Sequence, residues 1–516
     1  MFLVKFDYLV FLAVSMLAYY IVPGNCQWIV LRIFSRVFYM LAGIPYTVIY
    51  LLVAVIAVWI GVNYIEKYRE EVKKAKRVLL LCILIVAGLL TALKYTNFLL
   101  STYKEIGGIF RFGQDIQPVS WAASLGISFY SLQAISYLVD VYWGISTAQK
   151  NPFKVALFTC YFPQMSSGPI SRYHQLGDQL FMTHKFDYNR MCFGLQRILY
   201  GFIKKLVIAE NLEHYTRCIF NEDARYNGLF LCVGLAVYLF QLYMDFSGCM
   251  DIVLGTSECF GIYMSENFNR PFHSRTIQEF WKRWHITLGA WAQDYIMYPI
   301  LRSKMWTKMR RMMKLKFGRK AAQNISTYLA MAILWFYMGI WHGGAWHYVA
   351  EGVWFGLVIM SGQLLEGTFK KWIRILKINT KAAWWHGFQS IRTGVIFAIG
   401  VLFFIAVDIR QAFWYIKAAF SPKCWRWKNF IDQIRVFFSS FAKEDVHKTM
   451  VCIAVGVALV TVLLVFQAKE RSFYKWLADR NIVIRWTFLY IMLFTVILFG
   501  VYGPGYTASD FIYGGF

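Results

Sequence analysis

The sequence predicts an all-α polytopic membrane protein, and three observations lead to this fold class. Of the 516 residues, 58% are apolar and 19% are aromatic, whereas ordinary soluble domains are roughly 45–50% apolar. Stretches of about 20 apolar residues, long enough to cross a bilayer as a helix, recur along the chain. Basic residues cluster between these stretches, so the formal charge of +26 is explained by the positive-inside rule.

The apolar stretches predict about ten to twelve transmembrane helices. The clearest are residues 8–22, 45–64, 78–100, 121–141, 228–244, 325–340, 348–365, 393–407, 450–466 and 483–502. Two shorter stretches, 29–41 and 153–168, are predicted as half-spans or re-entrant pieces. We expect a single transmembrane domain over residues 1–516, with a motif-rich core at about 121–366 and C-terminal helices and a tail at 388–516.

Basic clusters set the predicted topology across the cell membrane. The positive-inside rule places four of them in the cytoplasm: residues 66–77, 302–320, 369–381 and 467–480. The chain between the second and third clusters must then cross the membrane and return, and residues 410–448 and the C-terminal tail lie outside. We interpret the run of residues 304–311 as a solvated loop, with contact to anionic membrane lipid as the alternative. This charge pattern does not indicate binding to nucleic acid.

His342 is the most informative position in the chain. It stands in Trp341-His342-Gly343-Gly344 at the end of an apolar run, residues 325–340, without Asp, Glu, Lys or Arg. An ionisable group at membrane depth is a functional-site hypothesis by default. The two glycines indicate a helix break, which is tolerated at this depth only where it is buried in protein or lines a cavity. The predicted topology places His342 toward the outer half of the membrane.

A second histidine, His285, belongs to a polar stretch in the middle of the chain. Thr276 and Glu279 have the spacing of a capping box, which predicts a helix start. Four residues of this predicted helix share one face: Trp281, Trp284, His285 and Leu288. His285 therefore points inward, as a satisfied core histidine or as part of a site.

Further polar groups interrupt the apolar stretches. Gln241 and Asp245 lie one helical turn apart, and residues 162–172 read as a broken element because they contain Pro and Gly. Lys94 and Asp140 are additional charges inside predicted spans. These groups are too numerous for an inert membrane anchor.

The motifs narrow the possible chemistry. His342 and His347 lack the spacing of a zinc-binding HExxH helix, and the ten cysteines contain no CxxC pair, so we expect no metal site and buried reduced thiols. No GxSxG elbow or P-loop occurs. A buried histidine that deprotonates a hydroxyl and directs it at a thioester suits acyl transfer. A transporter or flippase would also explain charges and broken helices inside the membrane.

At these residues the chain resembles the membrane-bound O-acyltransferase (MBOAT) family. Seven ordered motifs carry the resemblance: 126–130, 133–137, 162–164 with 168–170, 245–248, 266–272, 280–285 and 341–343. Within the family the chain is similar to the bacterial branch that contains the alginate O-acetylation membrane subunit and the teichoic-acid D-alanyl transfer protein.

The resemblance implies a ring of helices around a central funnel, with interfacial and re-entrant helices. It also implies that His342 is catalytic and that His285 lines the same tunnel. Further candidates for the tunnel or for substrate binding are Gln241, Asp245, Asn269, Trp284, Asp294 and Trp341. The family pattern Arg-Asp-Tyr reads Gln293-Asp294-Tyr295 in this chain, which leaves open any donor contact ascribed to that arginine.

The implied function is transfer of a short acyl group, expected to be acetyl, to an exported polysaccharide. The donor would be a cytoplasmic thioester, acetyl-CoA or an acylated carrier protein, and no bound cofactor is expected. The implied partner is an extracytoplasmic SGNH-type acyltransferase, and an acylated carrier protein as donor would add a partner on the cytoplasmic face. The rival within the class is D-alanylation of teichoic acid.

The C-terminal residues 511–516 resemble the Phe-Ile-Tyr-x-x-Phe ending of this branch. The resemblance suggests that Tyr513 relays the acyl group at the outer face. Equally, Tyr513 is explained as an interfacial aromatic anchor, which is common beside a transmembrane span.

Overall fold

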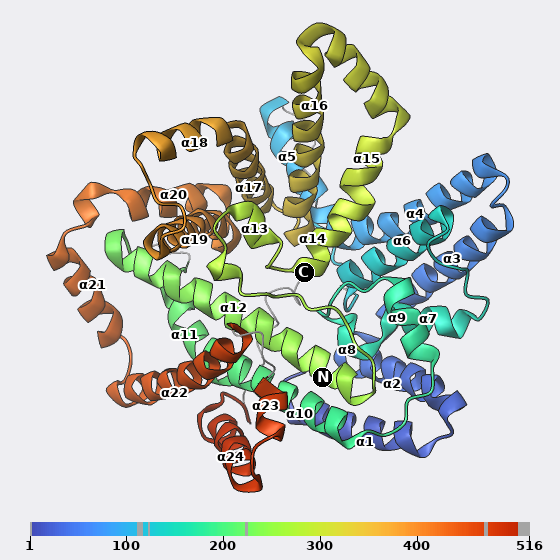
Figure 1. Cartoon of the computed structure of the whole chain (residues 1–516), viewed down its shortest axis with the longest axis horizontal. Helices are drawn as coiled ribbons and strands as arrows, with labels where there is room; N and C mark the ends of the chain where they lie inside the picture. Colours follow the sequence, from blue (N-terminus) through green and yellow to red (C-terminus); the bar gives the residue numbers. More distant parts are fainter. Residues whose placement is uncertain (1–2, 111–116, 122–123, 222–224, 469–472, 504–516) are drawn as a thin grey trace. The chain divides into compact units, whose positions relative to one another are not determined.

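The computed structural model is built almost entirely of helices (Figure 1). It describes residues 3–110, 117–121, 124–221, 225–468 and 473–503. Within these ranges no β-strand forms, and one isolated bridge pairs Phe268 with Trp284. The predicted all-α class is therefore confirmed.

The chain divides into two compact units, each assembled from separate stretches. Unit 1 comprises Met1–Leu93, Ser120–Ser265 and Ser421–Phe516, and unit 2 comprises Lys94–Val119 and Glu266–Phe420.

Unit 1 contains most of the helices. They are α1 (Phe6–Ile21), α2 (Gln27–Ala42), α3 (Val48–Lys67), α4 (Val72–Lys94), α6 (Ile127–Trp143), α7 (Pro152–Cys160), α8 (Phe162–Met165), α9 (Tyr173–Phe181), α10 (Tyr188–Phe202), α11 (Glu210–Ile219), α12 (Gly228–Cys259), α21 (Trp427–Ser439), α22 (Lys443–Ala468), α23 (Phe473–Ala478) and α24 (Ile482–Phe499). Short 3-10 turns form η1 (Gly24–Cys26), η2 (Pro45–Thr47) and η6 (Pro422–Cys424), and a π-helical segment, η3 (Ile203–Ala209), joins α10 to α11. The break predicted in residues 162–172 is confirmed, because α7, α8 and α9 are separate short helices.

The long helix α12 packs against α10 through glycines. A Cβ on Gly201 would meet the carbonyl oxygen of Gly248 at 2.6 Å, and one on Gly194 would meet that of Gly255 at 2.7 Å. Small residues of this kind let two helix backbones approach closely inside a membrane. The close approach lets α12 bury its polar side chains against the adjoining segment η3.

Unit 2 holds the remaining elements. They are α5 (Thr96–Phe110), η4 (Pro271–His273), α13 (Ile277–Trp281), α14 (Ile286–Ala292), the π-helical η5 (Gln293–Met297), α15 (Tyr298–Arg302), α16 (Lys304–His342), α17 (Trp346–Leu364), α18 (Glu366–Ile375), α19 (Ala383–Ile405) and α20 (Ile409–Phe420). All the residues of the candidate site described below belong to this unit.

The basic cluster at residues 302–320 is helical, so its prediction as a loop is wrong. Ser303 caps α16 by accepting a hydrogen bond from the backbone N–H of Trp306. No proline or glycine interrupts the helix before Gly318, where φ is 79° and the helix turns back. The indole N–H of Trp306 donates to the carbonyl oxygen of Ser326 at 3.3 Å. The two parts of α16 therefore form a hairpin, as Figure 1 shows, and touch at Trp306.

Seven helices of the described ranges are long and apolar enough to span a membrane. They are Pro45–Lys67, Val72–Lys94, Gly228–Cys259, Lys304–His342, Ala383–Ile405, Lys443–Val462 and Ile482–Phe499. The bent pair α17 and α18, with an angle of 58°, makes an eighth if it forms one span. The predicted spans at 8–22 and 121–141 form α1 and α6, of 16 and 17 residues, which is short for a crossing helix. The protein is thus a multi-pass membrane protein.

Candidate active site

The break predicted after His342 is confirmed. Helix α16 ends at His342 and α17 begins at Trp346. Gly343 lacks a side chain at a point where a Cβ would collide with the ring of Tyr348. The three-residue connection therefore returns the chain immediately and places the start of α17 against the end of α16.

Close contact continues along these two helices. A Cβ on Gly352 would collide with the carbonyl oxygen of Trp335, and one on Gly339 would meet the carbonyl oxygen of Tyr348. This approach brings Glu351 of α17 to His342, with 3.5 Å between the carboxylate Oε2 and the imidazole Nδ1. Both side chains are buried.

The indole ring of Trp341 contacts both predicted histidines. Its ring centroid lies 5.6 Å from that of His285 and 5.5 Å from that of His342, in edge-on arrangements. The ammonium group of Lys94 lies 5.6 Å from the same indole and donates to the Trp341 carbonyl oxygen at 2.7 Å. A cation at this position is favoured because the C-terminal end of a helix carries partial negative charge.

His285 is buried as predicted, but the helix expected around it is broken. Helix α13 ends at Trp281, and His285 adopts a left-handed conformation (φ 46°, ψ 52°) that caps the start of α14. Residues 267–269 pair with this turn: the N–H of Asn269 donates to the Arg283 carbonyl oxygen at 3.0 Å. Because this bond joins residues 267–269 to the turn, the helix ends at Trp281 and does not continue through His285.

Asn267 holds the turn at His285 in place. Its side-chain oxygen accepts from the backbone N–H of Thr287 at 3.0 Å and from the hydroxyl of the same residue at 2.7 Å. Its carbonyl oxygen accepts from the N–H of Ile286 at 3.1 Å. Burial, together with the nearby imidazole of His342, lowers the pKa of His285 to about 3. His285 is therefore a neutral imidazole at physiological pH.

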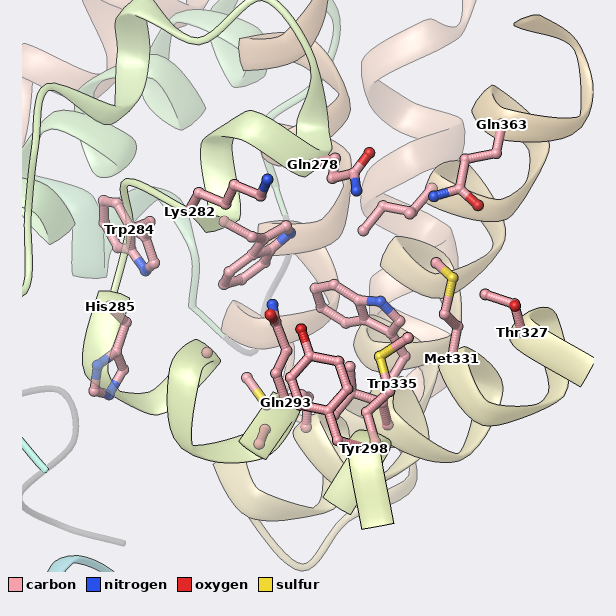
Figure 2. A pocket seen from close by; sticks show the side chains of 17 residues that line it. Gln278, Lys282, Trp284, His285, Gln293, Tyr298, Thr327, Met331, Trp335 and Gln363 are labelled. Atoms are coloured by element: carbon pink, nitrogen blue, oxygen red, sulfur yellow. The ribbon is translucent and has the colours of Figure 1, made fainter. Parts of the chain in front are cut away.

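A cavity of about 310 Å³ adjoins His285 (Figure 2). Its walls come from α13 to α17 and are mainly aromatic and aliphatic, with Trp281, Trp284 and Trp335 among them. Polar groups also line it: Gln278, Lys282, Gln293, Tyr298, Thr327 and Gln363. In Figure 2 the ends of Gln293 and Tyr298 point into this space. Apolar walls with a few polar groups are typical of small-molecule sites.

The structure gathers some of the predicted site residues and not others. Trp284 lines the cavity with His285, and Trp341 contacts both histidines. Asn269 is exposed. The cavity wall includes Gln293 but not the next residue, the predicted Asp294.

Gln241 and Asp245 belong to unit 1, where each has a partner. Gln241 accepts a hydrogen bond of 2.5 Å from Thr216, and Asp245 forms an ion pair of 2.5 Å with Lys205. Lys205 also pairs with Glu210 at 2.8 Å. Both side chains are thus buried with a partner inside unit 1. Tyr513 lies outside the described residues.

Sequence reasoning missed two buried polar residues of this site. Glu351 is an acid in the apolar stretch 348–365, so the rule that identified His342 could also have identified it. Asn267 lies two residues from the predicted Asn269, and only the fold distinguishes the buried amide from the exposed one.

Comparison with known proteins places the chain in a family. Residues 33–407 match the family model described as MBOAT, membrane-bound O-acyltransferase family. The chain is similar to a probable alginate O-acetylase of Pseudomonas aeruginosa, with 30% identity over 81% of this chain and 74% of the relative. It is also similar to a peptidoglycan O-acetyltransferase of Helicobacter pylori, with 28% identity over 68% of each chain. A teichoic acid D-alanyltransferase of Bacillus subtilis shares 30% identity over 55% of this chain and 67% of its own length.

The family match covers most of the chain, including both histidines, the cavity and the α16–α17 connection. The protein is a multi-pass O-acyltransferase and belongs to the membrane-bound O-acyltransferase family.

Proposed function

We propose that this protein transfers a short acyl group, acetyl, from a cytoplasmic thioester to hydroxyls of a polysaccharide outside the cell membrane. The relatives named as alginate and peptidoglycan O-acetylating proteins support a polysaccharide acceptor. One observation carries the proposal: the buried imidazoles of His285 and His342 both contact the indole of Trp341, and His285 also lines the cavity.

His342 acts as the general base in the proposed reaction. It takes the proton of the acceptor hydroxyl while the hydroxyl oxygen bonds to the thioester carbonyl carbon. The carbon–sulfur bond breaks, and the departing sulfur receives the proton from His342. The products are an ester and a free thiol, so His342 ends in its starting state.

His285 orients the thioester in this proposal. A neutral imidazole can donate a hydrogen bond from one nitrogen without carrying charge. The low pKa of His285 keeps its imidazole neutral at pH 7. The cavity beside it receives the acyl and thiol parts of the donor, acetyl-CoA or an acylated carrier protein. Lys282 and Gln293 on the cavity wall supply contacts to polar donor atoms, and no resident cofactor takes part.

In the relay form of this proposal, the hydroxyl that His342 deprotonates is the phenol of Tyr513. An extracytoplasmic SGNH-type acyltransferase then moves the acyl group from the tyrosine ester to the polymer hydroxyl and frees the phenol again. A carrier protein can dock on the cytoplasmic face. Tyr513→Phe should abolish polymer acylation while the protein folds normally. Retained acylation in that variant would exclude the relay and leave the anchor.

The first test measures release of free thiol from acetyl-CoA and from an acetylated carrier protein by the purified protein. His342→Ala should lower turnover by at least about 100-fold, the scale of general-base catalysis, and His285→Ala should also lower it. His386 is the matched control, because it bonds to the Thr380 carbonyl oxygen away from the cavity, and His386→Ala should turn over normally. Wild-type turnover in His342→Ala would contradict the proposed role of this residue.

A second candidate function is D-alanyl transfer to teichoic acid, which the Bacillus subtilis relative favours by its name. The same assay separates the two if D-alanyl carrier protein is added as a third donor. Preference for that donor over both acetyl donors would replace acetylation with D-alanylation.

A further inference from the structure

Glu351 is the buried acid in the part of unit 2 that the structure describes, and it lies beside His342, the proposed base. Its Oε2 is 3.5 Å from Nδ1 of His342, and the two side chains are only 5% and 6% exposed. This distance exceeds that of a good hydrogen bond. Catalytic hydrogen bonds are often long before substrate binds and shorten in the reactive complex.

The placement of Glu351 follows from the helix packing. Gly352, the next residue, is where the α17 backbone touches the carbonyl oxygen of Trp335 on α16. Gly339 makes the reciprocal close approach one turn before His342. Because these contacts set the register of the two helices, the carboxyl group is held at the imidazole.

The other ionisable groups around His342 come from several elements. Lys94, at the end of α4, binds the carbonyl oxygen of Trp341, and His285, before α14, contacts the ring of that tryptophan. On α17, His347 directs its Nδ1 to the Phe403 carbonyl oxygen of α19 at 2.9 Å, and its ring lies against Tyr348. Glu351 is the acidic group that lies against the imidazole of His342.

A carboxylate at one imidazole nitrogen has a defined chemical effect. It favours the tautomer with the proton on the nitrogen that faces it, and leaves the other nitrogen as a proton acceptor. It also stabilises the imidazolium that forms when the ring accepts a second proton. Here the nitrogen that faces the carboxylate is Nδ1, so Nε2 is the acceptor.

We propose that Glu351 is the positioning residue of His342, holding the proton on Nδ1 and presenting Nε2 to the acceptor hydroxyl. This inference rests on the proposed function, because it assigns a partner to the base of that reaction. In the forward step the hydroxyl proton moves to Nε2 while Nδ1–H stays directed at Glu351. The Nε2 proton then moves to the departing sulfur, and Glu351 exchanges no proton in the net reaction.

Glu351→Gln is the test, because it keeps the size of the side chain and removes its charge. With acetyl-CoA as donor, kcat should fall about 100-fold, within the range of general-base effects, while KM changes by less than about twofold because binding is not altered. The acid limb of the rate–pH profile should move down by about one pH unit, since the carboxylate no longer favours the imidazolium.

Two variants separate positioning from a structural role. Glu366→Gln is the matched control, because Glu366 is an exposed acid at the start of α18 that pairs with Lys370, and its kinetics should equal wild type. In a His342→Ala background, Glu351→Gln should cause no further loss, because Glu351 acts through His342. Should Glu351→Gln fail to fold, Glu351→Asp keeps the charge and should show lower kcat with the wild-type acid limb.

Each contrary result has a distinct meaning. Wild-type kinetics in Glu351→Gln, with His342→Ala inactive, would overturn this inference and leave the proposed function intact. A loss in Glu351→Gln with an unmoved acid limb, repeated in the His342→Ala background, would make Glu351 structural. Normal turnover in His342→Ala would overturn the proposed function and this inference together.

Discussion

His285 occupies a backbone conformation that costs a non-glycine residue about 1–3 kcal/mol. With φ at 46° and ψ at 52°, it persists because Asn267 binds the two residues that follow it. The strain therefore places an imidazole at the cavity and against Trp341. Strained residues of this kind are frequent at functional sites, and here the Asn267 side chain and backbone support the turn.

Asn267→Ala should destabilise the protein and lower its activity. The substitution leaves the buried N–H and hydroxyl of Thr287 without their acceptor, and each unsatisfied buried group costs about 1–3 kcal/mol. Thermal unfolding of the purified protein in detergent should show a transition lower by about 2–6 °C for such a loss in a chain of this size. Turnover at a temperature below the transition should also fall, because His285 loses its support.

Asn269→Ala is the control for Asn267→Ala. Asn269 is exposed, and its hydrogen bond to Arg283 comes from the backbone N–H, which the substitution preserves. Its transition temperature and turnover should match wild type. Equal losses of transition temperature and turnover in both variants would contradict a specific role of the Asn267 side chain in supporting the turn.

Some of these residues were predictable and others were not, for physical reasons. His342 stands out because an ionisable group in an apolar run is costly wherever the rest of the chain lies. His285 was identified, but its helix was wrong, because the competing contacts come from residues 267–269. Local periodicity carries no information about such a partner. The role of Glu351 needed the register of α16 against α17.

At the scale of elements, the site depends on the hairpin of α16 and α17. Two glycines that face each other's backbones set the distance between these helices, and His342 and Glu351 lie on either side of that contact. The sequence predicted both helices and the break between them, because apolar length and paired glycines are local signals. The fold-back of α16 at Gly318 was missed, since a basic, largely polar stretch gives no hydropathy signal.

Gly352→Ala should separate α16 from α17. The new methyl group would collide with the Trp335 carbonyl oxygen, which is backbone and cannot move aside alone. Overpacking of this kind costs about 1–3 kcal/mol, so thermal unfolding should occur at lower temperature. Turnover should fall below that of the wild type, because the distance between Glu351 and His342 increases.

Gly362→Ala is the matched control in the same helix. A Cβ at Gly362 meets no atom within 4 Å, and alanine favours a helix over glycine by up to about 1 kcal/mol. This variant should therefore be as stable as wild type or slightly more stable. If Gly352→Ala behaved like Gly362→Ala, the hairpin would tolerate separation and its glycines would not set the site.

At the scale of the whole molecule, charge is distributed in two ways. Inside unit 1, two buried lysines are paired with acids: Lys205 with Asp245 and Glu210, and Lys204 with Asp251. The remaining excess of positive charge lies in clusters between apolar helices. Paired charges can be buried in a membrane protein, whereas clusters with an excess of positive charge near the ends of the spans determine orientation. The orientation matters for function, because it decides which side of the membrane His342 faces.

The predicted topology is testable with two single cysteines in a background where the ten native cysteines are replaced by serine. Leu315, which is 90% exposed in the basic half of α16, should be cytoplasmic, and exposed Val436 of α21 should be outside. A membrane-impermeant maleimide should therefore label Val436→Cys in intact cells and Leu315→Cys only after permeabilisation. Thiol release from acetyl-CoA confirms that each variant is folded.

The reverse labelling pattern would place the end of α16 and His342 toward the cytoplasm. Because donor and acceptor meet at His342 in the proposed reaction, a polymer outside the cell would then be excluded as its direct acceptor.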